Sequence, residues 1–179
     1  MRKLAGFTLI ELIVVMVILG VLAVIAAPTF LNLQSDSRTA VLEATKGALE
    51  SAFQIFSLKA QVPSAEITET DGKIFIMLDG VSFGLTDDFY PIFPANIGDL
   101  DSLAHLNLLM NIDVSIAPAT GKGIKGFNYV YDYNGGFILY SGITDYDNSR
   151  CFISYAPDKI HSNLVEFKGE YFKIITDGC

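Results

Sequence analysis

The stretch FTLIELIVVMVILGVLAVIAAPTF, from Phe7 to Phe30, organises the whole chain. From Leu12 to Ala27 it contains no charged or strongly polar side chain. A helix needs about 20 apolar residues to cross the hydrocarbon core of a bilayer, and this stretch is long enough. Arg2 and Lys3 precede it, so we expect the basic N-terminal end to stay in the cytoplasm.

Two residues, Gly6 and Glu11, indicate that this stretch is more than a membrane anchor. Gly6 lies before the apolar run, whereas a secretory signal peptide has its cleavage site after that run. Glu11 is a carboxylate inside the run, and a lone acid in a membrane helix needs a partner. Cleavage after Gly6 would create an amine on Phe7, one helical turn from Glu11, and this amine would be the counter-charge. The alternative is an uncleaved signal-anchor helix in which Glu11 is tolerated near the membrane surface.

The segment GFTLIE, from Gly6 to Glu11, resembles the processing and assembly motif of type IV pilins and of type II secretion pseudopilins. The resemblance implies that a prepilin peptidase cuts after Gly6 and N-methylates Phe7, and that Glu11 directs assembly. It extends through Gly20, Pro28 and residues 30–36, where the chain is most similar to major pilins of the mannose-sensitive haemagglutinin (MSHA) type.

Beyond the apolar stretch, the helical pattern continues to about Leu58 with only one apolar face. Such a stripe needs a globular domain to cover it. We therefore expect one helix from Phe7 to about Ala60, with a kink or loosening at Gly20 and Pro28. The residues of the stripe are Leu42, Thr45, Leu49, Ala52, Phe53 and Phe56.

The C-terminal part has the pattern of an antiparallel sheet. Residues 128–133 and 137–140 flank Asn134-Gly135-Gly136, which is a strong hairpin signal, and residues 151–155 and 171–176 predict two more strands. Earlier in the chain we expect a strand at 73–78 with a turn at Asp79-Gly80, an irregular loop at 87–94 and a short helix at 100–111. The predicted fold class is α+β, with the type IV pilin fold: a long N-terminal α-helix packed on a C-terminal antiparallel β-sheet.

The chain has two cysteines, Cys151 and Cys179, the second being its last residue. A membrane-anchored chain whose bulk lies outside the cytoplasm reaches an oxidising compartment, where disulfides persist. Because only one intramolecular pairing is possible, we predict a disulfide between them. Two unrelated thiols are the alternative.

Other candidate sites are weaker. Asp145 and Asp147 place oxygen ligands at alternate positions, as a calcium loop does, but the rest of that pattern is missing and a solvated turn is expected. His105 and His161 have no metal-ligand spacing, and the glycines of residues 121–126 lack the ending of a phosphate-binding loop. We expect no cofactor and no enzymatic activity. The formal net charge of −8 argues against a nucleic-acid partner, since phosphates attract Lys and Arg clusters.

The expected domains are a prepilin leader at 1–6, a transmembrane and assembly segment at 7–35, and a globular head at 36–179. The expected function is that of a major pilin, a structural subunit that polymerises into a helical filament and serves attachment and biofilm formation. Its partners would be further copies of itself, the prepilin peptidase, the inner-membrane assembly machinery and a surface or host-cell receptor. It would span the inner membrane once before assembly and become extracellular afterwards. A minor pilin or a type II secretion pseudopilin is the alternative.

Overall fold

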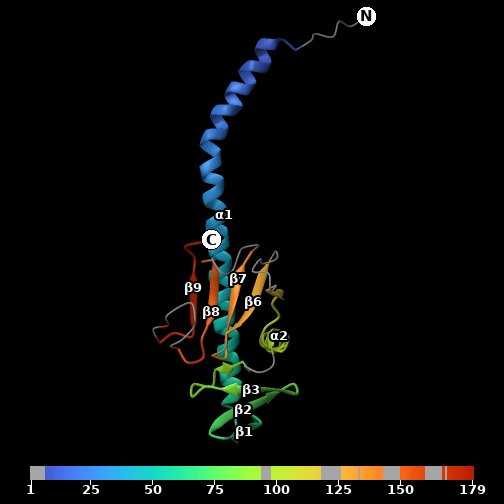
Figure 1. Cartoon of the computed structure of the whole chain (residues 1–179), viewed down its shortest axis with the longest axis vertical. Helices are drawn as coiled ribbons and strands as arrows, with labels where there is room; N and C mark the ends of the chain where they lie inside the picture. The colour runs from blue at the N-terminus through green and yellow to red at the C-terminus, as the bar shows by residue number, and fades with distance from the viewer. Residues whose placement is uncertain are drawn as a thin grey trace, which may run out of the picture. The chain divides into compact units, whose positions relative to one another are not determined.

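We describe a computed structural model, which covers residues 7–93, 98–117, 126–132, 134–142, 150–159, 167 and 169–179 (Figure 1). The predicted calcium candidates Asp145 and Asp147, together with His161 and the leader with Gly6, lie outside these residues. The chain divides into two compact units, one ending at Arg38 and the other running from Thr39 to Cys179. Each unit is described by itself below.

Helix α1 (Leu9–Ala60) is the first element and the longest one. It includes both Gly20 and Pro28, and the kink expected at these two residues stays a prediction. The helix ends where predicted: Gln61 donates its backbone N–H to the carbonyl of Leu58, and Pro63 follows two residues later. The expectation of one helix from Phe7 to about Ala60 is therefore confirmed apart from two residues at its start.

The head contains a five-stranded sheet in which the strands follow one another in chain order. Four of them pair antiparallel as predicted, through the hairpin at Asn134-Gly135 and the two later strands. The first strand pairs parallel with the second, which the sequence pattern did not predict. The strands are β5 (Val114–Ile116), β6 (Phe127–Asp132), β7 (Gly136–Ser141), β8 (Phe152–Tyr155) and β9 (Phe172–Ile175).

The first residue of β7, Gly136, lies where no side chain fits. A Cβ atom added there would lie 2.0 Å from the carbonyl oxygen of Tyr155 on the neighbouring strand. The adjacent Gly135 has a φ of 83°, which L residues with a side chain rarely adopt. The two glycines therefore permit both the tight turn and the close pairing of β7 with β8.

A second, four-stranded antiparallel sheet precedes the first one in the chain. One of its two central strands matches the predicted strand at 73–78, and the Asp79-Gly80 turn follows it with positive φ at both residues. Its other three strands were not predicted, and one of them lies in the expected irregular loop. The strands are β1 (Ile67–Thr70), β2 (Lys73–Leu78), β3 (Val81–Leu85) and β4 (Pro91–Ile92).

Helix α2 (Gly98–Leu109) lies between the two sheets in sequence and corresponds to the short helix expected at 100–111. Its Leu106 is fully buried in the main core, and Leu103 and Leu109 pack against the same cluster. The side of α2 that carries these three leucines therefore faces the core.

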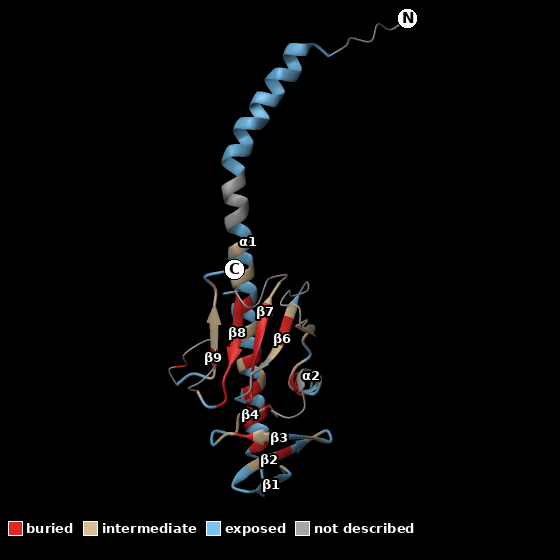
Figure 2. Cartoon of the chain, in the orientation of Figure 1, coloured by how far each residue is buried: buried red, intermediate tan, exposed pale blue. Residues whose placement is uncertain are grey.

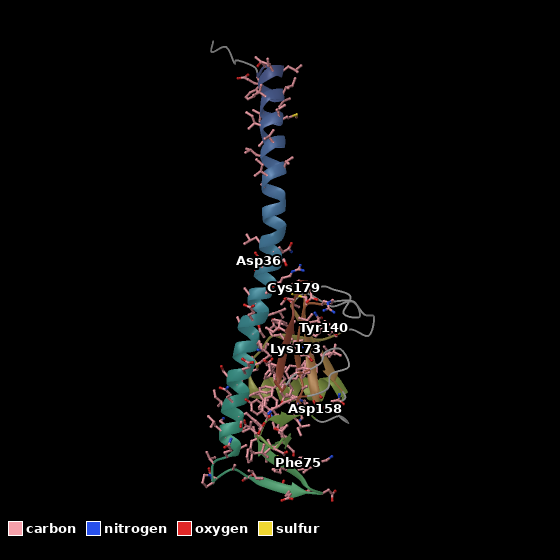
Figure 3. The ribbon with its side chains drawn as sticks, turned by 90° about the vertical axis from the view of Figure 1, so that its left-hand side faces the viewer. Asp36, Phe75, Tyr140, Asp158, Lys173 and Cys179 are labelled. Carbon is pink, nitrogen blue, oxygen red and sulfur yellow. A yellow bond between two sulfur atoms is a disulfide. The ribbon has the colours of Figure 1, made fainter. Side chains whose placement is uncertain are left out.

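The core of the head forms where the apolar stripe of α1 meets the two sheets (Figures 2 and 3). Leu42, Leu49 and Phe53 are fully buried against the five-stranded sheet. Phe56 and Ala60, one and two turns further on, are buried against the four-stranded sheet instead. Residues of α1 thus pack on both sheets, and their packing on the five-stranded C-terminal sheet is what the predicted fold class requires.

Phe53 is the centre of an aromatic cluster that joins α1 to three strands of the five-stranded sheet and to Phe93 after β4. Its ring lies 4.9 Å from that of Tyr155 and 5.1 Å from that of Phe172, measured between centroids, and both pairs meet edge to face. Phe93 and Phe137 complete the surroundings at 6.2 and 6.3 Å. Such edge-to-face pairs add a small stabilising free energy to that gained by burying the rings.

We predict that Phe53→Ala destabilises the head by about 3–5 kcal/mol, because it removes a fully buried ring and leaves a cavity. The matched control is Ile55→Ala on the same helix, whose side chain is 58% exposed and should cost about 0.5 kcal/mol or less. Urea unfolding of the full chain in detergent micelles, followed by the near-ultraviolet circular dichroism of tyrosine, measures both. Equal losses for the two variants would contradict the role given to Phe53.

Candidate functional site

The start of α1 is organised by Thr8 and Glu11. The backbone N–H of Thr8 donates to Oε2 of Glu11 at 3.0 Å, and the Thr8 hydroxyl donates to the same oxygen at 2.9 Å. In return, the backbone N–H of Glu11 donates to the Thr8 hydroxyl oxygen at 3.3 Å. This reciprocal pattern is a capping box, with Thr8 as the N-cap and Glu11 three residues later.

The capping box gives Glu11 a second role that our sequence reasoning missed. The Thr-x-x-Glu pattern was visible in the sequence and is the usual signal for such a cap. It folds the carboxylate back toward the first residues of the helix, the region where cleavage after Gly6 would place a new amine. The assembly role of Glu11 stays a prediction.

After this cap, α1 carries an apolar surface that nothing in its own unit covers. Every large apolar side chain from Leu9 to Ile25 is between 47% and 76% exposed. The segment Leu9–Ala26 has a mean hydropathy of 3.1 and is long and apolar enough to cross a membrane. Because so large an apolar surface is unfavourable in water, it requires lipid or protein around it.

The predicted disulfide between Cys151 and Cys179 is present. Polar contacts beside it join the same two chain segments. The Arg150 guanidinium pairs with the Asp177 carboxylate, with 2.7 Å between Nε and Oδ2, and the Gly178 N–H donates to the Arg150 carbonyl at 3.0 Å. The last residues of the chain are therefore attached to the sheet by covalent, ionic and backbone interactions.

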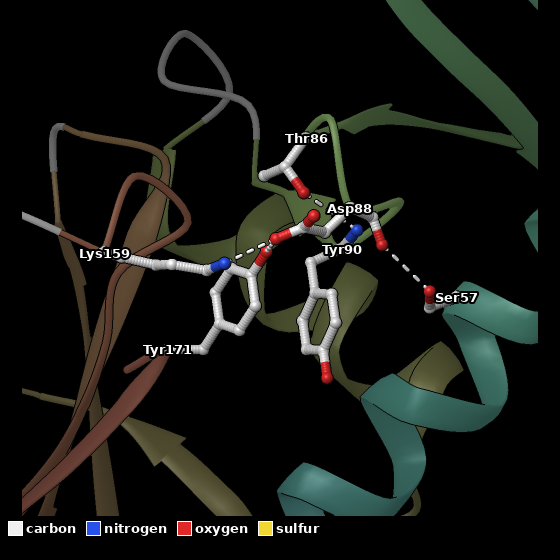
Figure 4. Close-up of polar contacts among 6 residues, drawn as sticks. All are labelled: Ser57, Thr86, Asp88, Tyr90, Lys159 and Tyr171. Atoms are coloured by element: carbon white, nitrogen blue, oxygen red, sulfur yellow. Dashed lines mark hydrogen bonds and ion pairs between the residues drawn. The ribbon is translucent and has the colours of Figure 1, made fainter. Parts of the chain in front are cut away.

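A polar cluster around Asp88 joins three segments that are far apart in the sequence (Figure 4). Oδ2 of Asp88 accepts hydrogen bonds from the Lys159 ammonium and, at 2.6 Å, from the Tyr171 hydroxyl. Lys159 also lies 4.3 Å above the centre of the Tyr171 ring, whose other neighbour, Tyr90, is stacked on it at 3.8 Å. The backbone carbonyl of Asp88 accepts from the Ser57 hydroxyl of α1 at 3.0 Å.

These contacts shift the ionisation of the groups that make them. The hydrogen bonds from Lys159 and Tyr171 hold the pKa of Asp88 below its ordinary value. The same bond to Asp88 raises the pKa of Lys159. Partial burial, followed by the bond to Asp88, raises the pKa of Tyr171. All three shifts favour the charged carboxylate, the charged ammonium and the neutral phenol at neutral pH.

His105 belongs to the core and not to a metal site. It is only 8% exposed, and its two ring nitrogens lie 2.7 Å from the Asp101 carbonyl oxygen and 3.3 Å from that of Ser82. Its ring also meets that of Phe83 edge to face. Within the described ranges, no group of three or more His, Cys, Asp or Glu side chains is placed to hold a metal ion.

We predict that Asp88→Asn lowers the stability of the head at pH 7 and lowers it less at pH 3. A carboxylate whose folded pKa lies below its unfolded value contributes stability above the unfolded pKa, near 3.9, and this contribution disappears as the pH falls through the folded value. Thermal unfolding of the wild type and the variant at both pH values measures the difference. Asp113→Asn, at an exposed position outside the cluster, is the control and should show no such pH-dependent difference.

Comparison with known proteins points to one end of the chain. Residues 1–27 match the model of the prokaryotic N-terminal methylation motif. The chain is also 42% identical over 62 residues to the major component PilA5 of the narrow type IV pilus of Thermus thermophilus. That alignment covers 34% of this chain and 53% of the relative, so the similarity spans about half the length of the pilin it matches. No solved structure matches the chain.

The matched motif and the fold both point to the same type of protein. The matched residues contain Gly6, Phe7 and Glu11 together with the apolar segment Leu9–Ala26, and the antiparallel strands that the pilin fold combines with such a helix follow later in the chain. The chain therefore carries the N-terminal methylation motif of type IV pilins on an α+β fold consistent with theirs, and it resembles a major pilus component.

Proposed function

We propose that this chain is the major structural subunit of a type IV pilus, released from a leader at residues 1–6 and polymerised through its N-terminal helix. The observation that carries the proposal is the match of residues 1–27 to the methylation motif, together with the exposure of the apolar side chains from Leu9 to Ile25 within that match. In this proposal residues 7–35 serve first as a single inner-membrane span and then as the assembly segment. Residues 36–179 form the head, which is extracellular in the filament.

The apolar surface from Leu9 to Ile25 supports a move from the membrane into the filament. Lipid covers it before assembly, and the helices of neighbouring copies cover it afterwards. Transfer from lipid to protein brings little hydrophobic gain, because lipid tails are as apolar as the side chains. Packing and polar contacts must therefore supply the specificity of assembly.

Glu11 provides such a polar contact. In the unassembled chain its carboxylate is bound by Thr8, and in the filament we propose that it pairs with the Phe7 amine of a neighbouring subunit. N-methylation leaves that amine charged. An unpaired carboxylate is costly in an apolar core, so the subunit is accepted only in the register that pairs it.

The exposed face of α1 within the head also suits contact with further copies. Its small and apolar residues follow each other at three- and four-residue steps, opposite the buried stripe. Small residues let helices approach closely. The face consists of Val41, Ala44, Ala48, Ser51, Ile55 and Leu58, all of them exposed.

The disulfide between Cys151 and Cys179 supports a head outside the cytoplasm, because such bonds persist in oxidising compartments. Attachment to surfaces and biofilm formation are the uses that we propose for the filament. The MSHA type is the subclass that we favour from residues 30–36. Recognition by the prepilin peptidase and by the assembly machinery follows from the same proposal.

We predict that filaments sheared from cells consist mainly of this chain, beginning at Phe7 and carrying one added methyl group. Mass spectrometry of the sheared material measures both the abundance and the N-terminus. An N-terminus at Met1 would contradict the proposed processing. Absence of the chain from abundant filaments would favour a minor pilin or a type II secretion pseudopilin instead.

We further predict that Glu11→Gln and Glu11→Ala both leave cleavage after Gly6 intact and both abolish filaments. Glutamine can still close the capping box with Thr8 but carries no charge, so this variant separates capping from charge pairing. The measurement is the amount of sheared filament against the amount of mature subunit in the membrane. Normal filaments from Glu11→Gln would show that the cap, and not the charge, is what assembly requires.

A further inference from the structure

Tyr90 and Tyr171 form a stacked pair of phenol rings beside the Asp88 carboxylate (Figure 4). Their ring centroids lie 3.8 Å apart, and the two ring planes differ by only 10°. Tyr90 directly precedes β4 and Tyr171 directly precedes β9, so the pair connects two segments that are far apart in the sequence. Both side chains are only partly buried, and small oxidants in the solvent can therefore reach them.

The phenol of Tyr171 already has a proton acceptor in place. Its hydroxyl donates to Oδ2 of Asp88 at 2.6 Å. A phenol becomes strongly acidic once it loses an electron, so a carboxylate bonded to it can take the proton as the electron leaves. The Lys159 ammonium, 4.3 Å from the ring centre, disfavours a positive charge on that ring and so favours this joint loss.

Tyr155 provides the contrast within the same group of rings. Its ring lies 6.3 Å from that of Tyr171, but its hydroxyl donates to the backbone carbonyl of Pro91. A backbone carbonyl is far too weak a base to take the proton, and Tyr155 is also fully buried. Of these two tyrosines, Tyr171 is therefore the one that loses an electron and a proton more easily.

Tyr90 has room to turn toward its partner. Its ring lies between Tyr171 and α1 (Figure 4), where it lines a pocket of about 250 Å³ together with Gln54, Ser57 and Leu58 of that helix. Its hydroxyl makes no hydrogen bond within the described part of the chain, whereas its backbone N–H and carbonyl are both bonded to Thr86. The ring can therefore rotate about its side-chain bonds while the loop keeps its place.

We propose that one-electron oxidants, such as the oxidised haem of a peroxidase, join Tyr90 and Tyr171 in a dityrosine cross-link. Tyr171 gives one electron to the oxidant while its phenol proton moves to Oδ2 of Asp88. Tyr90 gives a second electron to the oxidant and its phenol proton to water. The unpaired electrons of the two phenoxyl radicals then pair in a new bond between one Cε carbon of each ring.

Two proton movements complete the reaction. The hydrogen on each bonded Cε carbon moves through water to the phenol oxygen of its own ring, which restores both phenols. Asp88 releases its proton to the solvent and returns to the carboxylate. The protein thus loses two electrons and two protons in all, and the oxidant takes up the two electrons.

The cross-link would tie the loop between β3 and β4 covalently to the start of β9. Hydrogen bonding and ring stacking join these segments in the structure. Because β9 is an edge strand and the disulfide at Cys179 lies after it, this strand would be held covalently at both ends. The reaction concerns the head alone and does not require polymerisation, so this proposal and the pilus proposal can fail separately.

The test uses the full chain in dodecylphosphocholine micelles, diluted so that each micelle holds one chain. A ruthenium tris-bipyridyl complex, oxidised by light and persulfate, supplies the one-electron oxidant. Peptide mapping by mass spectrometry of the monomer band then detects the fragment of Tyr90 joined to the fragment of Tyr171, lighter than their sum by two hydrogen atoms. We expect this product together with the blue fluorescence of dityrosine.

Tyr90→Phe and Tyr171→Phe should each abolish the joined fragment, because each keeps the ring but removes one phenol. The matched control is Tyr155→Phe, which makes the same change in the neighbouring ring and should leave the yield unchanged. Asp88→Asn should slow the cross-linking about tenfold or more, since it removes the proton acceptor, and Asp88→Glu should restore the rate.

Near-ultraviolet circular dichroism confirms that each variant is folded before oxidation. The proposal is overturned if the oxidised wild type contains no fragment that joins residues 90 and 171. It is equally overturned if Tyr155→Phe lowers the yield as much as Tyr171→Phe does, or if Asp88→Asn cross-links as fast as the wild type.

Discussion

Burial of one face of α1 is the constraint on which the rest of the head depends. Leu49 and Phe53 pack into the five-stranded sheet, and Phe56 and Ala60 pack into the four-stranded sheet one turn later. Among the described residues the two sheets share no strand pairing, although the Tyr155 hydroxyl of β8 donates to the Pro91 carbonyl of β4 at 2.7 Å. The helix therefore supplies the common surface that both sheets need, and its apolar stripe decides where each of them lies along it.

Before Arg38 the described residues of the same helix form no face that is buried within the chain's own fold. Its large apolar side chains are exposed there, and full burial of each would be worth about 1.5–3 kcal/mol. A stripe on one face suits a helix that packs on a sheet, whereas apolar residues on all faces suit a helix surrounded by lipid or by other helices. The change of pattern near Asp36 thus indicates a change in what surrounds the helix, and it follows from residue types alone.

Polar contacts complete the head at two places where the hydrophobic core ends. Beside the disulfide, Arg150 and Asp177 attach the last residues to the start of β8. Near the boundary between the sheets, Asp88 connects loops that are 71 and 83 residues away along the chain. Exposed ion pairs contribute little to stability individually, so we expect the Asp88 cluster chiefly to orient the segments that it joins.

What the sequence determined by itself were the local features. The apolar run after Gly6, the stripe from Leu42 to Phe56, the turns at Asp79-Gly80 and Asn134-Gly135 and the pairing of the two cysteines each follow from patterns or from elimination. Tertiary structure alone decided the parallel pairing of β5 with β6, the three additional strands of the four-stranded sheet and the meeting of Asp88 with Lys159 and Tyr171. Short exposed strands such as β1 have little hydrophobic pattern of their own. Contacts between distant loops depend on how the core places them, and no local pattern in the sequence records that placement.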